Sequence, residues 1–166
     1  MWHPPNIKKA KLLDEKGLRG KTIELLSRRE YSYAELEAKL LPYTENEQLI
    51  YIVLDWMVEQ GYQSDERFAC MFVRSKGVSG YGPVRIRLEL NQKGIKEHLI
   101  EHAFEENKNE VIWPDEVDRL IEKKLKTQDI SDLKVKSKVM GYLQRRGFSL
   151  DQIYSGFNRH KDKTTI

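Results

Sequence analysis

The chain has 166 residues, about one domain's worth of protein, which excludes a large multidomain enzyme. Hydrophobic residues make up 39% of it and charged residues 33%, so it has the material for a packed core under an extensively charged surface, and global disorder is excluded. The formal net charge is only +3, and the longest apolar run, residues 49–54, is far shorter than the ~20 residues that cross a bilayer.

The chain opens with a segment, residues 1–19, that we expect to be an extension before the first helical unit. Its first five residues lack the apolar stretch of a secretory signal, so we expect the protein to stay in the cytoplasm. Cys70 is the single cysteine, which excludes an internal disulfide framework and agrees with a reducing compartment.

Helix-start signals recur along the chain. Ser32, Thr44 and Ser149 each begin an S/T-x-x-E/Q capping box, in which two side chains bond reciprocally to exposed backbone amides. Pro83 and Pro114 stand where first-turn prolines are favoured. Together with the three-four spacing of apolar residues, these signals predict about nine helices, over residues 18–29, 32–41, 45–60, 65–76, 83–93, 96–106, 114–126, 132–146 and 149–160.

One segment gives a conflicting signal. The run from Val84 to Leu90 alternates apolar and charged residues, which by period alone is typical of a half-buried strand. On a helix, the same run places Val84 and Leu88 on one side and Ile86 and Leu90 nearly opposite, as in a helix sandwiched between two neighbours. We favour the helix because the segment belongs to an internal repeat.

The repeat pairs two segments that lie 53 residues apart with identical spacing. Leu90, Gly94, Ile95, Ile100 and Phe104 match Leu143, Gly147, Phe148, Ile153 and Phe157. In both copies a basic residue and a glycine end a helix, because glycine adopts the left-handed conformation that closes one. A looser third copy, with a longer turn through Pro42, contains Leu36 and Leu40.

The repeat predicts an all-α protein of three tandem three-helix units. We expect these units at residues 20–62, 63–107 and 108–160, with a C-terminal tail at 161–166. Units this small cannot bury their apolar faces alone, so each should lean on its neighbours in an elongated, curved molecule.

Charge is unevenly distributed along the chain. Residues 67–96 carry a net +6, residues 97–118 a net −7 and residues 119–147 a net +6. A solvated charged surface explains this pattern, and so does a basic groove for nucleic acid between acidic walls. Basic side chains near helix ends suit phosphate contacts. The candidates are Arg28, Arg29, Arg67, Arg74, Lys76, Arg85, Arg87, Lys93, Lys124, Lys138, Arg145 and Arg146.

Aromatic residues near these cations have two interpretations. Tyr62, Tyr81, Tyr142 and Phe148 either pack at helix junctions, which we favour, or stack on unpaired bases.

Enzyme motifs are weak. His98 to His102 reads H-x-x-E-H, the inverted zinc-peptidase pattern, but the histidines lie among glutamates on the polar side of the helix, with no third ligand indicated. The glycine-rich segment 77–83 lacks the lysine of a phosphate-binding loop. We therefore expect no catalytic residue, no metal and no cofactor.

Two stretches, residues 60–69 and 73–95, closely resemble the RecX family of bacterial regulatory proteins. The resemblance extends more loosely to residues 25–36 and 142–148. The family usually has Leu or Ile and then Asp after its Gly-Tyr, where this chain has Gln63 and Ser64. The motif positions are Gly61, Tyr62, Asp65, Phe68, Tyr81, Gly82, Pro83, Ile86, Leu90 and Gly94.

The resemblance implies a function that composition does not. RecX proteins modulate RecA recombinase, so the implied activity is binding the RecA filament on single-stranded DNA and inhibiting its ATPase, co-protease and strand-exchange activities. Recombination, DNA repair and the SOS response would be modulated in turn. Capping of filament ends and destabilisation of the interior both remain open, as does contact with double-stranded DNA, and we expect a monomer. The alternative is a helical DNA-binding module that acts without RecA.

Overall fold

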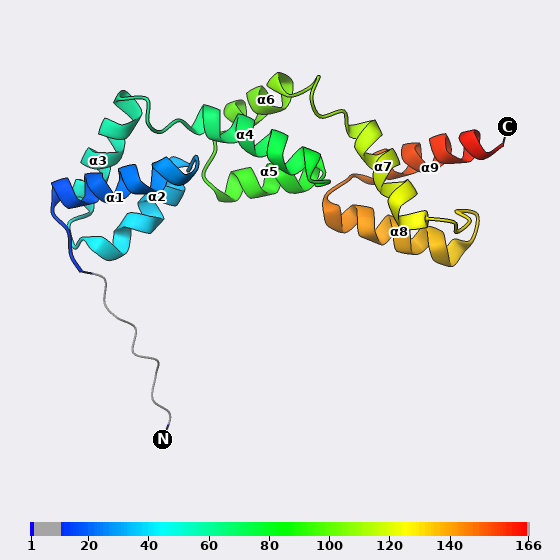
Figure 1. The fold of residues 1–166 in the computed structure, drawn as a ribbon, viewed down its shortest axis with the longest axis horizontal. Helices are drawn as coiled ribbons and strands as arrows, with labels where there is room; N and C mark the ends of the chain where they lie inside the picture. Colours follow the sequence, from blue (N-terminus) through cyan, green and yellow to red (C-terminus); the bar gives the residue numbers. More distant parts are fainter. Residues whose placement is uncertain (2–10, 166) are drawn as a thin grey trace. The chain divides into compact units, whose positions relative to one another are not determined.

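The computed structural model describes residue 1 and residues 11–165, so most of the segment used to assess a secretory signal lies outside it. Within that part of the chain every regular element is helical (Figure 1). The elements are α1 (Glu15–Arg28), α2 (Tyr33–Leu40), the 3₁₀ turn η1 (Leu41–Tyr43), α3 (Glu47–Glu59), α4 (Asp65–Val78), α5 (Pro83–Gln92), α6 (Glu97–Glu106), α7 (Trp113–Leu125), α8 (Leu133–Arg146) and α9 (Leu150–Thr164).

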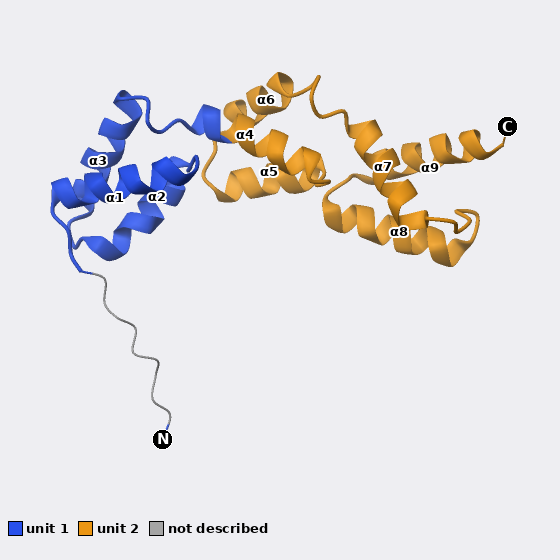
Figure 2. Cartoon of the chain, viewed as in Figure 1, with its two compact units in different colours: residues 1–68 blue, residues 69–166 orange. Residues whose placement is uncertain are grey.

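The nine predicted helices are confirmed among the described residues, with ends that differ by a few residues. None of these helices is both long and apolar enough to traverse a bilayer. The chain divides into two compact units, Met1–Phe68 and Ala69–Ile166 (Figure 2). The elongated, curved outline stays a prediction, as do the boundaries of the three-helix units.

The first unit packs α1, α2 and α3 against one another. Its core includes Leu18, Leu36 and Leu54, which are fully buried. Ser32 forms the predicted capping box with Glu35 at the start of α2. Here η1, which contains Pro42, stands in place of the basic residue and glycine that end α5 and α8.

The capping box predicted at Thr44 is wrong. Helix α3 begins at Glu47, and its N-cap is Asn46, whose side chain accepts a hydrogen bond from the Gln48 amide. Thr44 instead accepts from the Asn46 amide and so shapes the turn before the cap. Asparagine caps helices as well as threonine does, and here it stands two residues closer to the first helical turn.

The second unit holds α5 and α6, which pack on each other, and α7, which packs on both α8 and α9. Gly156 lets α9 lie close to α7, because a Cβ at this position would stand 2.6 Å from Val117 Cγ1. The Arg159 guanidinium donates to Asp118 Oδ1 at 2.9 Å and so joins the same two helices. Ser149 forms the predicted capping box at the start of α9.

The helix prediction for Val84 to Leu90 is confirmed, but the sandwiched arrangement is wrong. Ile86 and Leu90 are fully buried, whereas Val84 and Leu88 are 55% and 57% exposed. Helix α5 therefore buries one face only. The error arises because periodicity shows where apolar residues lie on a helix but not whether a neighbour covers each side.

Burial and backbone geometry agree with the internal repeat. Leu90 and its counterpart Leu143 are both fully buried. Gly94 and Gly147 have φ angles of +77° and +100°, the left-handed conformation predicted after each helix.

Candidate functional site

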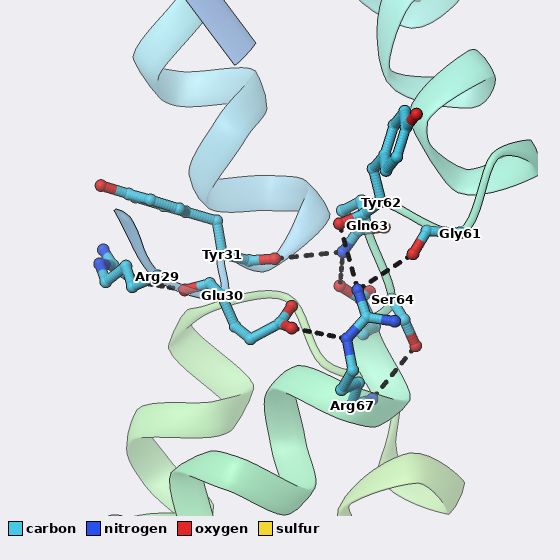
Figure 3. Close-up of polar contacts among 9 residues, drawn as sticks. Arg29, Glu30, Tyr31, Gly61, Tyr62, Gln63, Ser64 and Arg67 are labelled. Carbon is cyan, nitrogen blue, oxygen red and sulfur yellow. Dashed lines mark hydrogen bonds and ion pairs between the residues drawn. The ribbon is translucent and has the colours of Figure 1, made fainter. Parts of the chain in front are cut away.

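The first motif segment, Gly61 to Arg67, forms a network of polar contacts where α3 leads into α4 (Figure 3). The Arg67 guanidinium pairs with Glu30 at 2.6 Å and also donates to the carbonyls of Gly61 at 3.2 Å and Tyr62 at 3.1 Å. Gly61 has a φ of +74°, which a glycine adopts without strain. Arg67 therefore ties the turn before α4 to the loop before α2, and we call this network the α3–α4 junction.

Asp65 and Gln63 complete the α3–α4 junction. Asp65 Oδ1 accepts from the Tyr33 amide and from Gln63 Nε2, both at 2.9 Å. Gln63, one of the departures from the RecX pattern, is buried and also donates to the Tyr31 carbonyl at 3.3 Å (Figure 3). A polar residue is accommodated here because the NH₂ group of its buried amide has two hydrogen-bond acceptors.

Replacing Arg67 tests whether the junction stabilises the first unit. Arg67→Ala removes an ion pair and two hydrogen bonds to carbonyls, and we expect it to lower the free energy of unfolding by about 1–2 kcal/mol. The control is Arg28→Ala, which removes only an exposed pair with Glu24 one helical turn away, worth about 0.3–0.5 kcal/mol. Urea denaturation followed by circular dichroism measures both, and equal losses would contradict a structural role for Arg67.

The second motif segment, Tyr81 to Val84, contacts the end of α8. The Gly82 amide donates to the Arg146 carbonyl at 2.7 Å, and the Val84 amide donates to the Gly147 carbonyl at 3.0 Å. A Cβ on Gly82 would lie 2.3 Å from the Gly147 carbonyl oxygen, so only glycine allows this approach. These contacts, the α5–α8 junction, link the loop before α5 to the turn after α8.

Cations surround the Tyr81 ring at the α5–α8 junction. Arg146 Cζ lies 4.3 Å, Arg85 Cζ 4.5 Å and Lys76 Nζ 4.8 Å from its centroid. Arg146 also donates to the Ser79 carbonyl at 3.1 Å, and Arg85 donates to the Arg145 carbonyl at 3.3 Å. Three candidate phosphate-binding cations are thus engaged in cation–π contacts within the protein.

Two further candidates pair with the acidic block. Arg87 bonds to Glu101 and lies 4.4 Å over the Phe104 ring, and Arg74 pairs with Glu110 at 2.6 Å. The glutamate of the H-x-x-E-H pattern is therefore held by an arginine. No group of three or more His, Cys, Asp or Glu side chains suited to a metal ion occurs in the described part of the chain.

The Arg87–Glu101 pair gives a pH-dependent signature. The hydrogen bond from Arg87 holds the pKa of the Glu101 carboxyl below its ordinary value. A carboxyl group whose pKa is lowered in the folded state contributes stability at pH values above its pKa in the unfolded chain. This contribution is lost as the pH falls through the pKa of the folded state. We expect Arg87→Gln to raise the pKa of Glu101 toward the ordinary value of a glutamate carboxyl, measured by NMR titration. The pKa of Asp129, which Ser131 lowers, should not move.

The remaining candidates differ in their surroundings. Arg29 pairs with Glu35 at 2.8 Å and lies over the Tyr31 ring, and Lys93 lies 5.8 Å from the Phe72 ring centroid. Lys124, Lys138 and Arg145 instead line a groove of about 370 Å³ between α7 and α8, here called the α7–α8 groove. Its neutral polar residues Gln128 and Ser137 were missed from the sequence, because neutral residues give no charge signal.

The four candidate aromatic residues differ in burial and in the groups that contact their rings. Phe148 is buried and Tyr81 lies among the cations of the α5–α8 junction. Tyr142 is half-buried, with Lys124 Nζ 4.2 Å from its ring centroid. Tyr62 is 52% exposed and its ring is tilted against Trp56 at 5.8 Å. Packing explains the first three.

These features define an all-α protein built of three-helix units, with motif residues that hold its junctions together. The model of the RecX second three-helix domain matches residues 64–103, and that of the third matches residues 116–155. The regulatory protein RecX of Pseudomonas putida is 35% identical over 82% of this chain and 86% of its own length. The regulatory protein RecX of Acinetobacter baylyi is 34% identical over 88% of this chain and 89% of its own length.

Solved structures support the same fold. The crystal structure of RecX from Lactobacillus salivarius superposes with a TM-score of 0.75 at 23% identity, covering 87% of this chain and 95% of that one. A second RecX structure gives the same TM-score over 73% of its chain. The chain belongs to the RecX family, whose members are regulatory proteins that modulate RecA and are not enzymes.

Proposed function

We propose that this chain binds the RecA filament on single-stranded DNA and inhibits its ATPase, co-protease and strand-exchange activities. Membership of the RecX family carries the proposal, because the relatives match over most of their own length and not through one shared domain. The compartment we propose is the cytoplasm, and the acting species a monomer. Arg67, Arg85 and Arg146 support this function indirectly, because they hold together the junctions that position the contact surfaces.

The alternative is a DNA-binding module that acts without RecA. The α7–α8 groove favours it, since three cations gather there on two adjacent helices. Both functions are compatible, because a filament regulator that also touches DNA gains affinity from two contacts at once. Single-stranded DNA is the expected partner of this groove, and duplex DNA is the further candidate.

Sedimentation distinguishes the two functions. RecA is assembled on long single-stranded DNA with a slowly hydrolysed ATP analogue, and the chain is added before ultracentrifugation. The proposal predicts that the chain pellets with the filaments far more than with the same DNA without RecA. Equal pelleting in both samples would leave only the DNA-binding alternative, and recovery of the chain in both supernatants would contradict both functions.

A further inference from the structure

Among the residues that the structure describes, the α7–α8 groove gathers three cations and no counter-charge. Its lining includes Lys124 from α7 with Lys138 and Arg145 from α8, and none of the described residues that line it is a carboxylate. All three cations are exposed. Within the described chain, no carboxylate lies within ion-pair distance of them, whereas Arg28, Arg67, Arg74 and Arg87 each have one.

Local structure explains why these side chains converge. Lys138 and Arg145 are seven residues apart in α8, two helical turns, so they project from the same face. Gly141 lies between them, and a Cβ there would stand 3.2 Å from Arg145 Nη1, so the glycine leaves room for the guanidinium. Lys124, near the C-terminal end of α7, adds the third positive charge.

The lining also indicates what kind of ligand fits. Gln128 and Ser137 add neutral hydrogen-bonding groups to the three cations, which together suit the oxygens of an anion. Lys124 lies over the Tyr142 ring, so that ring face is already covered and does not serve as a platform for a base. Three cations on two helices, two of them separated by two helical turns, match a chain of phosphates better than one small anion.

We propose that the α7–α8 groove binds the phosphate backbone of single-stranded nucleic acid, independently of base sequence. This inference builds on the proposed function, since it assigns the DNA contact of a RecA regulator to one surface. It also separates that contact from Arg67, Arg85 and Arg146 of the two junctions, whose guanidinium groups donate to backbone carbonyls within the protein. The groove thus holds DNA while other surfaces meet RecA.

Salt-dependent DNA binding in the absence of RecA tests this proposal. The probe is fluorescently labelled oligothymidylate, and anisotropy gives its affinity over a series of NaCl concentrations. The test variant is Lys124→Gln/Lys138→Gln/Arg145→Gln. The control, Lys16→Gln/Lys39→Gln/Lys96→Gln, removes three exposed lysines outside the groove and changes the net charge equally.

We expect the groove variant to bind at least about tenfold more weakly at moderate salt. Its log–log salt slope should be shallower by about 2, because each phosphate that the protein no longer neutralises reduces the slope by about 0.7. The control variant should keep the slope of the unmodified chain. Circular dichroism melting curves of all three proteins should coincide, because the substituted side chains are exposed.

Two results would overturn the proposal. Equal losses in both variants would show that only net charge matters. Unchanged DNA binding by a folded groove variant that no longer inhibits RecA would show that the groove faces protein. Because the binding assay contains no RecA, failure of the groove proposal is distinguishable from failure of the proposed RecA regulation.

Discussion

Replacing Leu90 by alanine is expected to lower the free energy of unfolding by about 3–4 kcal/mol. Leu90 is fully buried on the inner face of α5, beside the equally buried Ile86. Removing most of its side chain leaves a cavity that the rigid helices around it fill only in part, so transfer and cavity terms add. The measurement is urea denaturation of the full chain followed by circular dichroism.

Leu88 supplies the matched control from the same helix. It is 57% exposed, so Leu88→Ala removes little buried surface, and we expect a loss below about 1 kcal/mol. The contrast between positions two residues apart tests directly whether α5 buries one face or two. Similar losses for both substitutions would contradict the one-sided burial of α5 and restore the sandwiched arrangement.

Replacing Gly82 by alanine is expected to disrupt the α5–α8 junction and to lower the free energy of unfolding by about 2–4 kcal/mol. A Cβ at this position meets the Gly147 carbonyl oxygen at 2.3 Å and the Phe148 amide nitrogen at 2.6 Å. Both are backbone atoms, so no side-chain rotation relieves the clash. The hydrogen bonds that Gly82 and Val84 donate across the junction are expected to break together.

Hydrogen exchange locates this effect. In the Gly82→Ala variant the Val84 amide should exchange much faster, because its acceptor, the Gly147 carbonyl, moves away. The control is Gly20→Ala in α1, where a Cβ meets nothing within 4 Å and alanine favours the helix by up to about 1 kcal/mol. An unchanged exchange rate at Val84 would show that the junction does not depend on glycine.

Much of the fold was predictable because it rests on local signals. The capping boxes at Ser32 and Ser149 formed as their spacing indicated. The left-handed glycines Gly94 and Gly147 ended their helices where the repeat placed them. Such features involve residues within one or two helical turns, so sequence spacing carries the necessary information.

Features that depend on distant partners were not predictable in this way. The exposure of Val84 and Leu88 depends on whether another element covers that side of α5. Asn46 and not Thr44 is the N-cap of α3, and both residue types favour the N-cap position, so the sequence alone did not decide between them. The burial of Gln63 depends on its contact with Tyr31, 32 residues away. Periodicity carries no information about such contacts.

The candidate site shows the same division. Charge blocks identified the basic residues, but not which of them are paired with acids or with tyrosine rings. Arg146 and Lys138 belong to the same basic block and the same helix, yet Arg146 lies against Tyr81 while Lys138 lines the α7–α8 groove. The twelve candidate residues therefore remain a prediction, and we propose the α7–α8 groove as the leading DNA contact among them.

RecA's DNA-dependent ATP hydrolysis tests the central claim most directly. RecA from the same source is assembled on single-stranded DNA, and this chain is titrated from far below to above the RecA concentration. A filament regulator should inhibit hydrolysis well below one copy per RecA monomer, because each bound molecule affects many subunits through an end, a break or cooperative spreading. Absence of inhibition at every ratio, with DNA coverage by RecA checked in parallel, would contradict RecA regulation.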